Sequence, residues 1–339
     1  MEAGEEQARV PITGERTLDV IGFGSLNLDE MWEVSAAFLR RWNLIPGEEY
    51  VRDVDWFRQI YPELRQEGSL KAVEPGGSAA NAIAALRRMG FRTGYVGAAG
   101  LDEVGNLRLS ELGEPEHLRI TMTDRPAGRC LALLNVDDPA RDRSLVILPN
   151  ANDLAGCEPE DDQFFLESRW VHLTSFVASA PLEAQMRLVE RISGRVRVSF
   201  DPGAVYAAKG LAGLKRIVSR SDLVFVSVEE LHRLCGSLDT RAAVSELLGL
   251  GVRVVVVKLG AQGIEAHSHD GRVHCPAVPV ARVLDRTGAG DVAAAGFLVG
   301  MLKSAPLHTC LNIAAMAAAR SIKGYGRSTY PDRRILMEM

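Results

Sequence analysis

Residues 253–258, RVVVVK, form a run whose side chains are apolar on both faces of an extended chain. Such a run is typical of a strand inside a parallel sheet, because helices cover both faces of that kind of sheet. Five earlier apolar runs indicate further strands: Asp19–Ser25, Thr93–Gly97, Val171–Ser175, Val196–Asp201 and Asp222–Val226. The residues between them include helical patterns, of which Ser78–Met89 and Leu182–Ile192 each place apolar residues on one face. This alternation predicts an α/β fold with a doubly wound, mostly parallel sheet flanked by helices.

Two segments interrupt the alternation of strands and helices. Residues 28–75 hold charged and aromatic side chains and a helical pattern, SAAFLRRW, while residues 119–146 hold two strand-like runs, ITMTD and RCLALLNV. Both segments leave the core soon after a strand and return to it. We therefore predict that they form a small lid over the carboxyl edge of the sheet, where open α/β sheets bind ligands. The alternative is two ordinary insertions that share no role. In either case we expect one domain that covers residues 18–339.

The composition limits the classes of protein to which the chain can belong. It is 47% hydrophobic and 24% charged, and its formal charge of −5 gives no electrostatic case for a nucleic-acid partner. No apolar run approaches the roughly 20 residues that span a bilayer, so we expect no membrane association. Residues 1–17 are acidic and polar without the apolar stretch of a signal peptide, which predicts a disordered tail. Five scattered cysteines without a C-x-x-C pair are typical of reduced thiols in a cytoplasmic protein.

The strongest functional signal is DRTGAGD at residues 285–291, which precedes a helical pattern rich in small residues. Two glycines, Gly288 and Gly290, flank Ala289. They let the backbone turn sharply and bring successive N–H groups to one point. The free N–H groups and dipole of the following helix make this point suitable for a phosphate that carries developing negative charge. Asp291 lies in the first turn, where its carboxylate can remove a proton from an attacking hydroxyl. The structural alternative is a simple turn with Asp291 as a helix cap.

Two other segments carry candidate substrate contacts. Gly76 and Gly77 precede a predicted helix, and paired glycines permit close approach to a ligand and can act as a hinge. Asn81 lies one turn into that helix and can offer its amide to a hydroxyl. Asn27 and Asp29 follow the first predicted strand and alternate along an extended chain, so that both can face the hydroxyls of a sugar. Each segment taken alone also fits an ordinary turn or a polar strand end.

Two loops after later strands indicate a nucleotide site. Ser227 and Glu230 follow one predicted strand, where the Glu230 carboxylate could hold water on Mg²⁺ or could simply cap the next helix. Lys258 ends another strand, and Gly260 and Gly263 after it form a glycine-rich turn that could admit a nucleotide. The chain has no G-x-x-x-x-G-K-[ST] sequence, which excludes a P-loop kinase.

Taken in this order, the segments resemble the ribokinase/PfkB carbohydrate kinase family from about residue 18 onward. GGSAANAIAALRRMG looks like the first signature of that family, and DRTGAGDVAAAGF looks like the second. The resemblance implies Asp291 as the base and three residues as the anion hole: Gly288, Ala289 and Gly290. It implies five substrate contacts: Asn27, Asp29, Gly76, Gly77 and Asn81. Around ATP it implies Ser227, Lys258, Gly260 and Gly263, with Glu230 near Mg²⁺ and with Asp285 and Thr287 near a monovalent cation such as K⁺.

Within the family, the long segment between the first strand and the paired glycines is most similar to adenosine kinase. FLRRWNLIPGEEY resembles part of that enzyme, and RSLVILPNAND resembles its arginine-led strand, which implies Asn152 as a contact near the lid. The chain departs from the family pattern at Ser227, where asparagine is usual, and at Ala293, where an aromatic residue is common.

The resemblance therefore implies an ATP-dependent kinase that phosphorylates a hydroxymethyl group of a sugar or a nucleoside. Such a protein would be a cytoplasmic monomer or homodimer. Because a fold alone does not fix a function, the alternative is a non-catalytic small-molecule-binding or regulatory protein on the same scaffold. The departures at Ser227 and Ala293 favour that alternative, whereas the intact base and anion hole favour the kinase.

Overall fold

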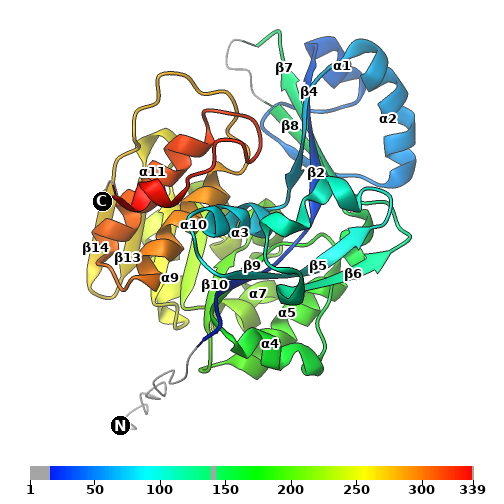
Figure 1. The fold of residues 1–339 in the computed structure, drawn as a ribbon. Coiled ribbons are helices and arrows are strands. Elements are labelled where there is room, and N and C mark those ends of the chain that lie inside the picture. Colours follow the sequence, from blue (N-terminus) through cyan, green and yellow to red (C-terminus); the bar gives the residue numbers. More distant parts are fainter. Residues whose placement is uncertain (1–15, 139–142, 338–339) are drawn as a thin grey trace.

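The computed structural model describes residues 16–138 and 143–337. The predicted tail at residues 1–17 lies almost wholly outside the described residues. Two sheets form the framework of the molecule, one of nine strands and one of five. Figure 1 shows the smaller sheet standing above one edge of the larger one, at the upper right of the view.

The larger sheet has the strand order β14-β13-β12-β11-β10-β9-β1-β5-β6. Its strands are β1 (Leu18–Phe23), β5 (Thr93–Gly100), β6 (Leu118–Thr123), β9 (Ser168–Thr174), β10 (Arg197–Asp201), β11 (Leu223–Ser227), β12 (Val254–Lys258), β13 (Ile264–Ser268) and β14 (Gly271–Cys275). Every neighbouring pair from β6 to β12 is parallel, whereas the two pairs at the edge, β12 with β13 and β13 with β14, are antiparallel. The predicted mostly parallel sheet is confirmed, because each apolar run of the sequence corresponds to one of these strands.

Helices cover both faces of the large sheet (Figure 1). One face packs against α3 (Ser78–Arg88), α10 (Ala289–Leu302) and α11 (Leu307–Ser321). The other face packs against α4 (Asp162–Leu166), α5 (Ser179–Ile192), α6 (Gly203–Ala207), α7 (Gly210–Val218), α8 (Val228–Cys235) and α9 (Thr240–Gly249). The two faces therefore bury separate apolar cores, as a doubly wound fold requires.

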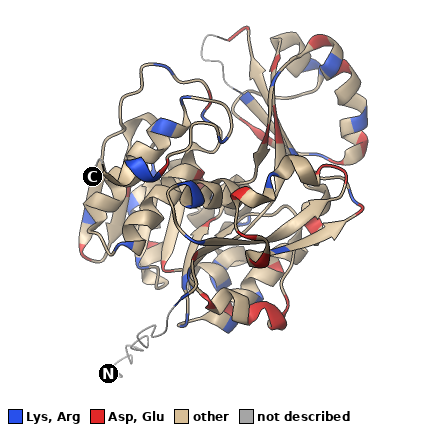
Figure 2. Cartoon of the chain, viewed as in Figure 1, with Lys and Arg blue, Asp and Glu red and all other residues tan. Residues whose placement is uncertain are grey.

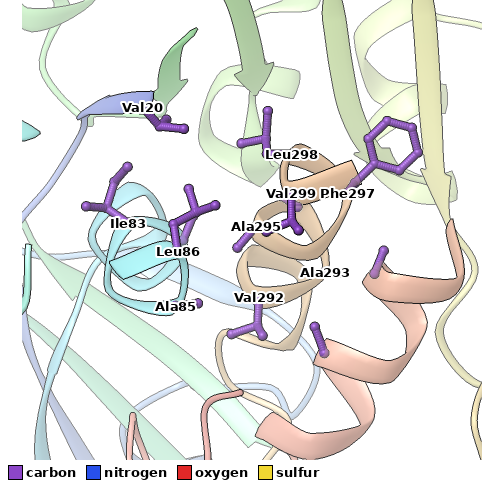
Figure 3. Packing of buried hydrophobic residues seen from close by; sticks show 14 of the residues in the cluster. Val20, Ile83, Ala85, Leu86, Val292, Ala293, Ala295, Phe297, Leu298 and Val299 are labelled. Atoms are coloured by element: carbon purple, nitrogen blue, oxygen red, sulfur yellow. The ribbon is translucent and has the colours of Figure 1, made fainter. Parts of the chain in front are cut away.

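Helix α10 lies in the middle of its layer, between α3, α11 and the sheet. Figure 3 shows Ala295 of α10 beside Leu86 of α3, with Phe297 directed towards the sheet. Because α10 is covered on several sides, most of its residues are buried and apolar rather than alternating with polar ones. This packing fixes the position of the first turn of α10, which carries Asp291.

The smaller sheet, which we call the lid sheet, has the order β3-β8-β7-β2-β4. Its strands are β2 (Asn27–Val34), β3 (Glu49–Val51), β4 (Ser69–Gly76), β7 (Gly128–Asn135) and β8 (Arg143–Leu148). Helices α1 (Ala36–Arg41) and α2 (Val54–Glu67) pack on one face through a third apolar cluster. Both sequence segments that interrupt the alternation thus contribute strands to one sheet. The run ITMTD does not, because it lies in β6, which pairs with β5 in the large sheet.

Acidic and basic residues are interspersed over both parts of the molecule, as Figure 2 shows. No helix within residues 16–138 and 143–337 is both long enough and apolar enough to cross a membrane.

Candidate active site

The first turn of α10 forms the centre of the candidate site. Gly288 caps the helix with φ +73°, and a Cβ atom at this position would lie 2.9 Å from the Tyr330 hydroxyl oxygen. Val292 N–H donates the first helical hydrogen bond to Gly288 O (3.0 Å), while Ala289 N–H donates to the Arg286 carbonyl (3.2 Å). The N–H groups of Gly290 and Asp291 fall in the part of a helix that lacks internal acceptors. These two N–H groups could therefore bind an anion, and the anion hole predicted at Gly288, Ala289 and Gly290 stays a prediction.

The Asp291 carboxyl group is surrounded by protein on most sides. Asn81 Nδ2 donates a hydrogen bond to Asp291 Oδ2 (3.0 Å), which joins α3 to α10 across the site. Desolvation by burial raises the pKa of Asp291 to about 7, although the Asn81 bond lowers it. Asp201 and Asp29 raise this pKa further and Lys258 lowers it. A carboxyl group with a pKa close to neutral suits a general base.

The lid strand β2 brings Asn27 and Asp29 to the same site. In the register of the lid sheet Asn27 pairs with Gly76, and a Cβ atom at Gly76 would collide with the Asp29 carboxyl group. Gly77 has φ +97°, and a Cβ atom there would collide with the Ser25 carbonyl oxygen. Both glycines are thus required by the close approach of the protein's own Asp29 and Ser25. The approach to a ligand and the hinge that the sequence suggests for them stay predictions.

Asp29 is a buried carboxyl group, with 6% of its surface exposed. Burial raises its pKa to about 7, and the positive charge of Arg327 is the strongest influence in the opposite direction. Its Oδ1 atom is buried and has no hydrogen-bond partner among the described residues. A substrate hydroxyl is the kind of group that could satisfy such an oxygen.

Asn152 lies beneath the lid strand rather than beside an open space. Its amide accepts from Leu26 N–H (2.8 Å) and donates to Leu26 O (3.1 Å) and Asn27 Oδ1 (2.8 Å). Both hydrogens of its Nδ2 are therefore used by neighbouring residues. The direct substrate contact predicted for Asn152 stays a prediction, and its observed bonds serve to position Asn27.

Several polar residues end neighbouring parallel strands beside the anion hole. Lys258 Nζ lies 2.7 Å from Asp201 Oδ2 and 3.7 Å from Glu230 Oε2. These partners, led by Asp201, raise the pKa of Lys258 and keep it cationic, despite burial. Glu230 and Ser227 form a reciprocal capping box at the start of α8, with Glu230 N–H donating to Ser227 Oγ (3.1 Å) and Ser227 N–H donating to Glu230 Oε2 (2.7 Å). The capping role considered from the sequence is present, whereas the Mg²⁺ role of Glu230 stays a prediction.

A cavity of about 600 Å³ adjoins Lys258 and Gly290. Gly260 and Gly263 line it, and both have positive φ, of +58° and +103°. Much of the remaining wall consists of alanine and other apolar side chains, including Ala293. The small Ala293 side chain, where the family often has an aromatic ring, leaves room in this cavity. An apolar cavity beside a cationic group and free N–H groups has the features of a nucleotide site.

Asp285 and Thr287 lie on the loop that leads to α10. Asp285 Oδ1 accepts from Thr287 N–H (2.8 Å), whereas Asp285 Oδ2 and Thr287 Oγ1 are buried without a partner among the described residues. Hard cations prefer such oxygen atoms, so both residues fit the predicted monovalent-cation site. Within the described ranges, no group of three or more His, Cys, Asp or Glu residues could hold a metal ion.

Sequence reasoning missed three residues that the structure places at the site: Asp201, Arg327 and Tyr330. Asp201 ends a predicted strand in the same way as Lys258, so its position alone could have identified it. Arg327 and Tyr330 lie in the turn after α11, where no pattern in the sequence distinguishes them from surface residues.

Comparison with known proteins gives consistent matches. The sequence model of the family described as "pfkB family carbohydrate kinase" matches residues 49–333. An uncharacterized sugar kinase of Archaeoglobus fulgidus is 32% identical over 71% of this chain and 95% of its own length. A nucleoside kinase of Methanothermobacter thermautotrophicus is 28% identical over 83% of this chain and 88% of its own. The crystal structure of adenosine kinase from Sinorhizobium meliloti superposes with a TM-score of 0.78 at 22% identity, over 95% of this chain and 98% of that one.

Proposed function

The chain belongs to the pfkB family of carbohydrate kinases, and from this premise we propose that it transfers the γ-phosphoryl group of ATP to a hydroxymethyl group of a nucleoside. Membership makes the chain a sugar or nucleoside kinase, that is, a phosphotransferase with an alcohol acceptor, and it implies ATP as the phosphoryl donor. The proposal concerns the nature of the acceptor and the roles of individual residues.

The observation that carries the proposal is the position of the Asp291 carboxylate beside the free N–H groups of α10. Asp291 removes the proton from the acceptor hydroxyl as its oxygen attacks the γ-phosphorus. The N–H groups of Gly290 and Asp291, together with the Lys258 ammonium, stabilise the negative charge on the transferring oxygens. The bond between the γ-phosphorus and the bridging oxygen breaks, and ADP leaves from the alanine-lined cavity.

The acceptor would lie between the lid strand β2 and helix α3. Asn27, Asp29 and Asn81 offer two amides and a carboxylate to its hydroxyls, at the paired glycines where the backbone approaches closely. Mg²⁺, when bound, neutralises charge on the phosphates, and Glu230 would hold it through water. A monovalent cation such as K⁺ would bind Asp285 and Thr287, each of which has a buried oxygen without a partner among the described residues.

Two features favour a nucleoside over a simple sugar. The segment from β2 to β4 adds helices α1 and α2 to the lid sheet, and this segment resembles adenosine kinase. The relatives also include proteins named cytidine kinase and nucleoside kinase. Relatives named ribokinase and fructokinase make simple sugars the second candidate.

The test is an ADP-release assay with ATP–Mg²⁺ and four acceptors: adenosine, cytidine, ribose and fructose. We expect acceptor-dependent ADP release, faster with a nucleoside, and formation of the 5′-phosphate. Asp291→Asn should bind the acceptor but lose turnover by about 10²–10⁴-fold, because proton removal in the transition state is lost. Turnover with sugars only would refute the nucleoside assignment. Normal turnover by Asp291→Asn would refute the assignment of the base.

A further inference from the structure

Arg327 is an almost completely buried cation behind the acceptor side of the site, with 2% of its surface exposed. It lies in the turn after α11, and its main-chain carbonyl accepts a hydrogen bond from Arg88 Nη1 (3.0 Å). Its guanidinium donates to Asn81 Oδ1 through Nε (3.3 Å) and to Glu111 Oε2 through Nη1 (3.1 Å). A buried guanidinium with so few partners is costly, which indicates that its contacts have a purpose.

We propose that Arg327 is a positioning residue, which holds the Asn81 amide in the one orientation that keeps Asp291 available as the base. This inference rests on the proposed function, since it assigns to Asp291 the role of accepting the hydroxyl proton. Arg327 touches neither the acceptor hydroxyl nor the phosphates in this arrangement and acts through Asn81.

The orientation follows from the hydrogen-bonding capacity of the two neighbours of Asn81. Arginine can only donate and an ionised carboxylate can only accept, so the amide must turn Oδ1 to Arg327 and Nδ2 to Asp291. If the amide flipped, Oδ1 would face the Asp291 carboxylate, and two acceptors would meet. The flipped amide would fit only the protonated form of Asp291, which cannot act as a base. Arg327 thus favours the ionised carboxylate by stabilising the amide orientation that supports it.

The remaining charges around Asp291 come from other elements, and Arg327 affects one of them, because its positive charge lowers the pKa of Asp29. Lys258 on β12 lowers the pKa of Asp291, while Asp201 on β10 and Asp29 on β2 raise it. The Asn81 hydrogen bond is the largest of the influences that lower this pKa. Loss of the fixed amide should therefore raise the pKa of Asp291 even when all three charges remain.

The test measures the ionisation of Asp291 directly, without an acceptor. Protein labelled with ¹³C at the aspartate carboxyl carbons is titrated by NMR, and the Asp291 signal is identified by its absence in Asp291→Asn. We expect the midpoint of this signal to rise by about one pH unit in Arg327→Met, which corresponds to a roughly tenfold smaller ionised fraction below the midpoint. The matched control is Arg88→Met, which removes the bond to the carbonyl of the same residue but leaves the guanidinium contact with Asn81 intact.

Arg327→Lys separates charge from geometry, because an ammonium group keeps the charge but cannot span Asn81 and Glu111 as the planar fork does. A raised midpoint in both Arg327 variants supports positioning. A raised midpoint in Arg327→Met alone would mean that only charge matters and would overturn the inference, as would a midpoint equal to that of the wild type in both. If Arg327→Met does not fold, the midpoint of Arg327→Lys decides.

Steady-state kinetics provide a second measurement. They use whichever of adenosine, cytidine, ribose and fructose gives the highest rate with the wild type. The acid limb of kcat should move to higher pH in the Arg327 variants, so that their deficit is largest at low pH and shrinks as pH rises. An equal loss at every pH would indicate general structural damage and would contradict positioning. The two possible failures can be distinguished. If the proposed function is wrong, the wild type is inactive with every acceptor, while the Asp291 midpoint still rises in the Arg327 variants. If this inference is wrong, the wild type is active and the midpoint does not rise in both variants.

Discussion

At the scale of single residues, Asp291 illustrates a conflict between stability and chemistry. Its pKa in the folded protein is about 7, above the 3.8 of an unperturbed aspartate, because burial disfavours the charged form. A group whose pKa is raised on folding favours the folded state when it is protonated and loses that contribution as pH rises through the folded pKa. At pH 8 the ionised Asp291 carboxylate therefore lowers the stability of the folded protein, although the proposed chemistry requires this ionised form.

We predict from this that Asp291→Asn increases the free energy of unfolding at pH 8 by about 1–3 kcal/mol. This value is smaller than the full pKa shift would give, because solvent screens the part of the carboxyl group that it reaches. The gain should shrink as pH falls from 7 towards 4, where the wild-type carboxyl group becomes protonated in the folded state. Urea denaturation at several pH values measures both effects. A variant that is less stable than the wild type at pH 8 would contradict the account.

The residues also show what the sequence can and cannot reveal. Asp291, Gly288 and Gly290 are recognisable because their spacing creates a helix start with a particular chemistry. Arg327 is not recognisable, because its role depends on a contact with Asn81, 246 positions away, which arises only when the turn after α11 packs against α3. A residue of this kind carries no local pattern.

At the scale of elements, strands were predictable wherever both faces are buried, as in β12, since a short continuous apolar run rich in valine is typical of a strand covered on both sides. The assignment of ITMTD to the lid was wrong, because alternation shows that a run is extended but not which sheet receives it. The close contact between α10 and α11 was also not predictable. It depends on Gly296 of α10 lying against the backbone of α11.

We predict that Gly296→Ala lowers the free energy of unfolding by about 1–3 kcal/mol through overpacking. The new Cβ atom would lie 2.8 Å from Ala314 Cα and from the Ile313 carbonyl oxygen, and neither can move without shifting α11. Gly213→Ala is the matched control, because Gly213 is an exposed position inside α7 where the nearest atom to a new Cβ atom is Lys209 Cβ at 3.3 Å, so that a small shift is enough. That variant should be more stable than the wild type by about 0.4–1 kcal/mol. Equal effects of the two variants in urea denaturation would refute the packing argument.

At the scale of the whole molecule, the lid and the main domain are joined by Arg129 of β7. Its guanidinium donates to Glu30 of the lid strand β2 (2.6 Å) and to Glu103 (2.9 Å), which follows β5 of the large sheet. Because Asp29 belongs to the lid, while Asn81 and Asp291 belong to the main domain, the acceptor site that we propose would be complete only when the two parts are held together. The bond to Glu103 should therefore control how much of the protein is ready to bind the acceptor.

We predict that Glu103→Gln raises the KM for the acceptor about two- to fivefold and leaves kcat nearly unchanged, because an ion pair that is partly open to solvent contributes about 1 kcal/mol. Glu30, with 2% of its surface exposed, keeps its cation in this variant, so the lid itself should remain folded. Glu63→Gln is the matched control, since Glu63 accepts from Arg41 Nε (3.1 Å) and Trp42 Nε1 (3.2 Å) wholly within the lid. Steady-state kinetics with the best acceptor should show a change in KM for the first variant only. If kcat falls while KM stays constant, Arg129 supports the chemistry of α10 rather than the joining of the two parts.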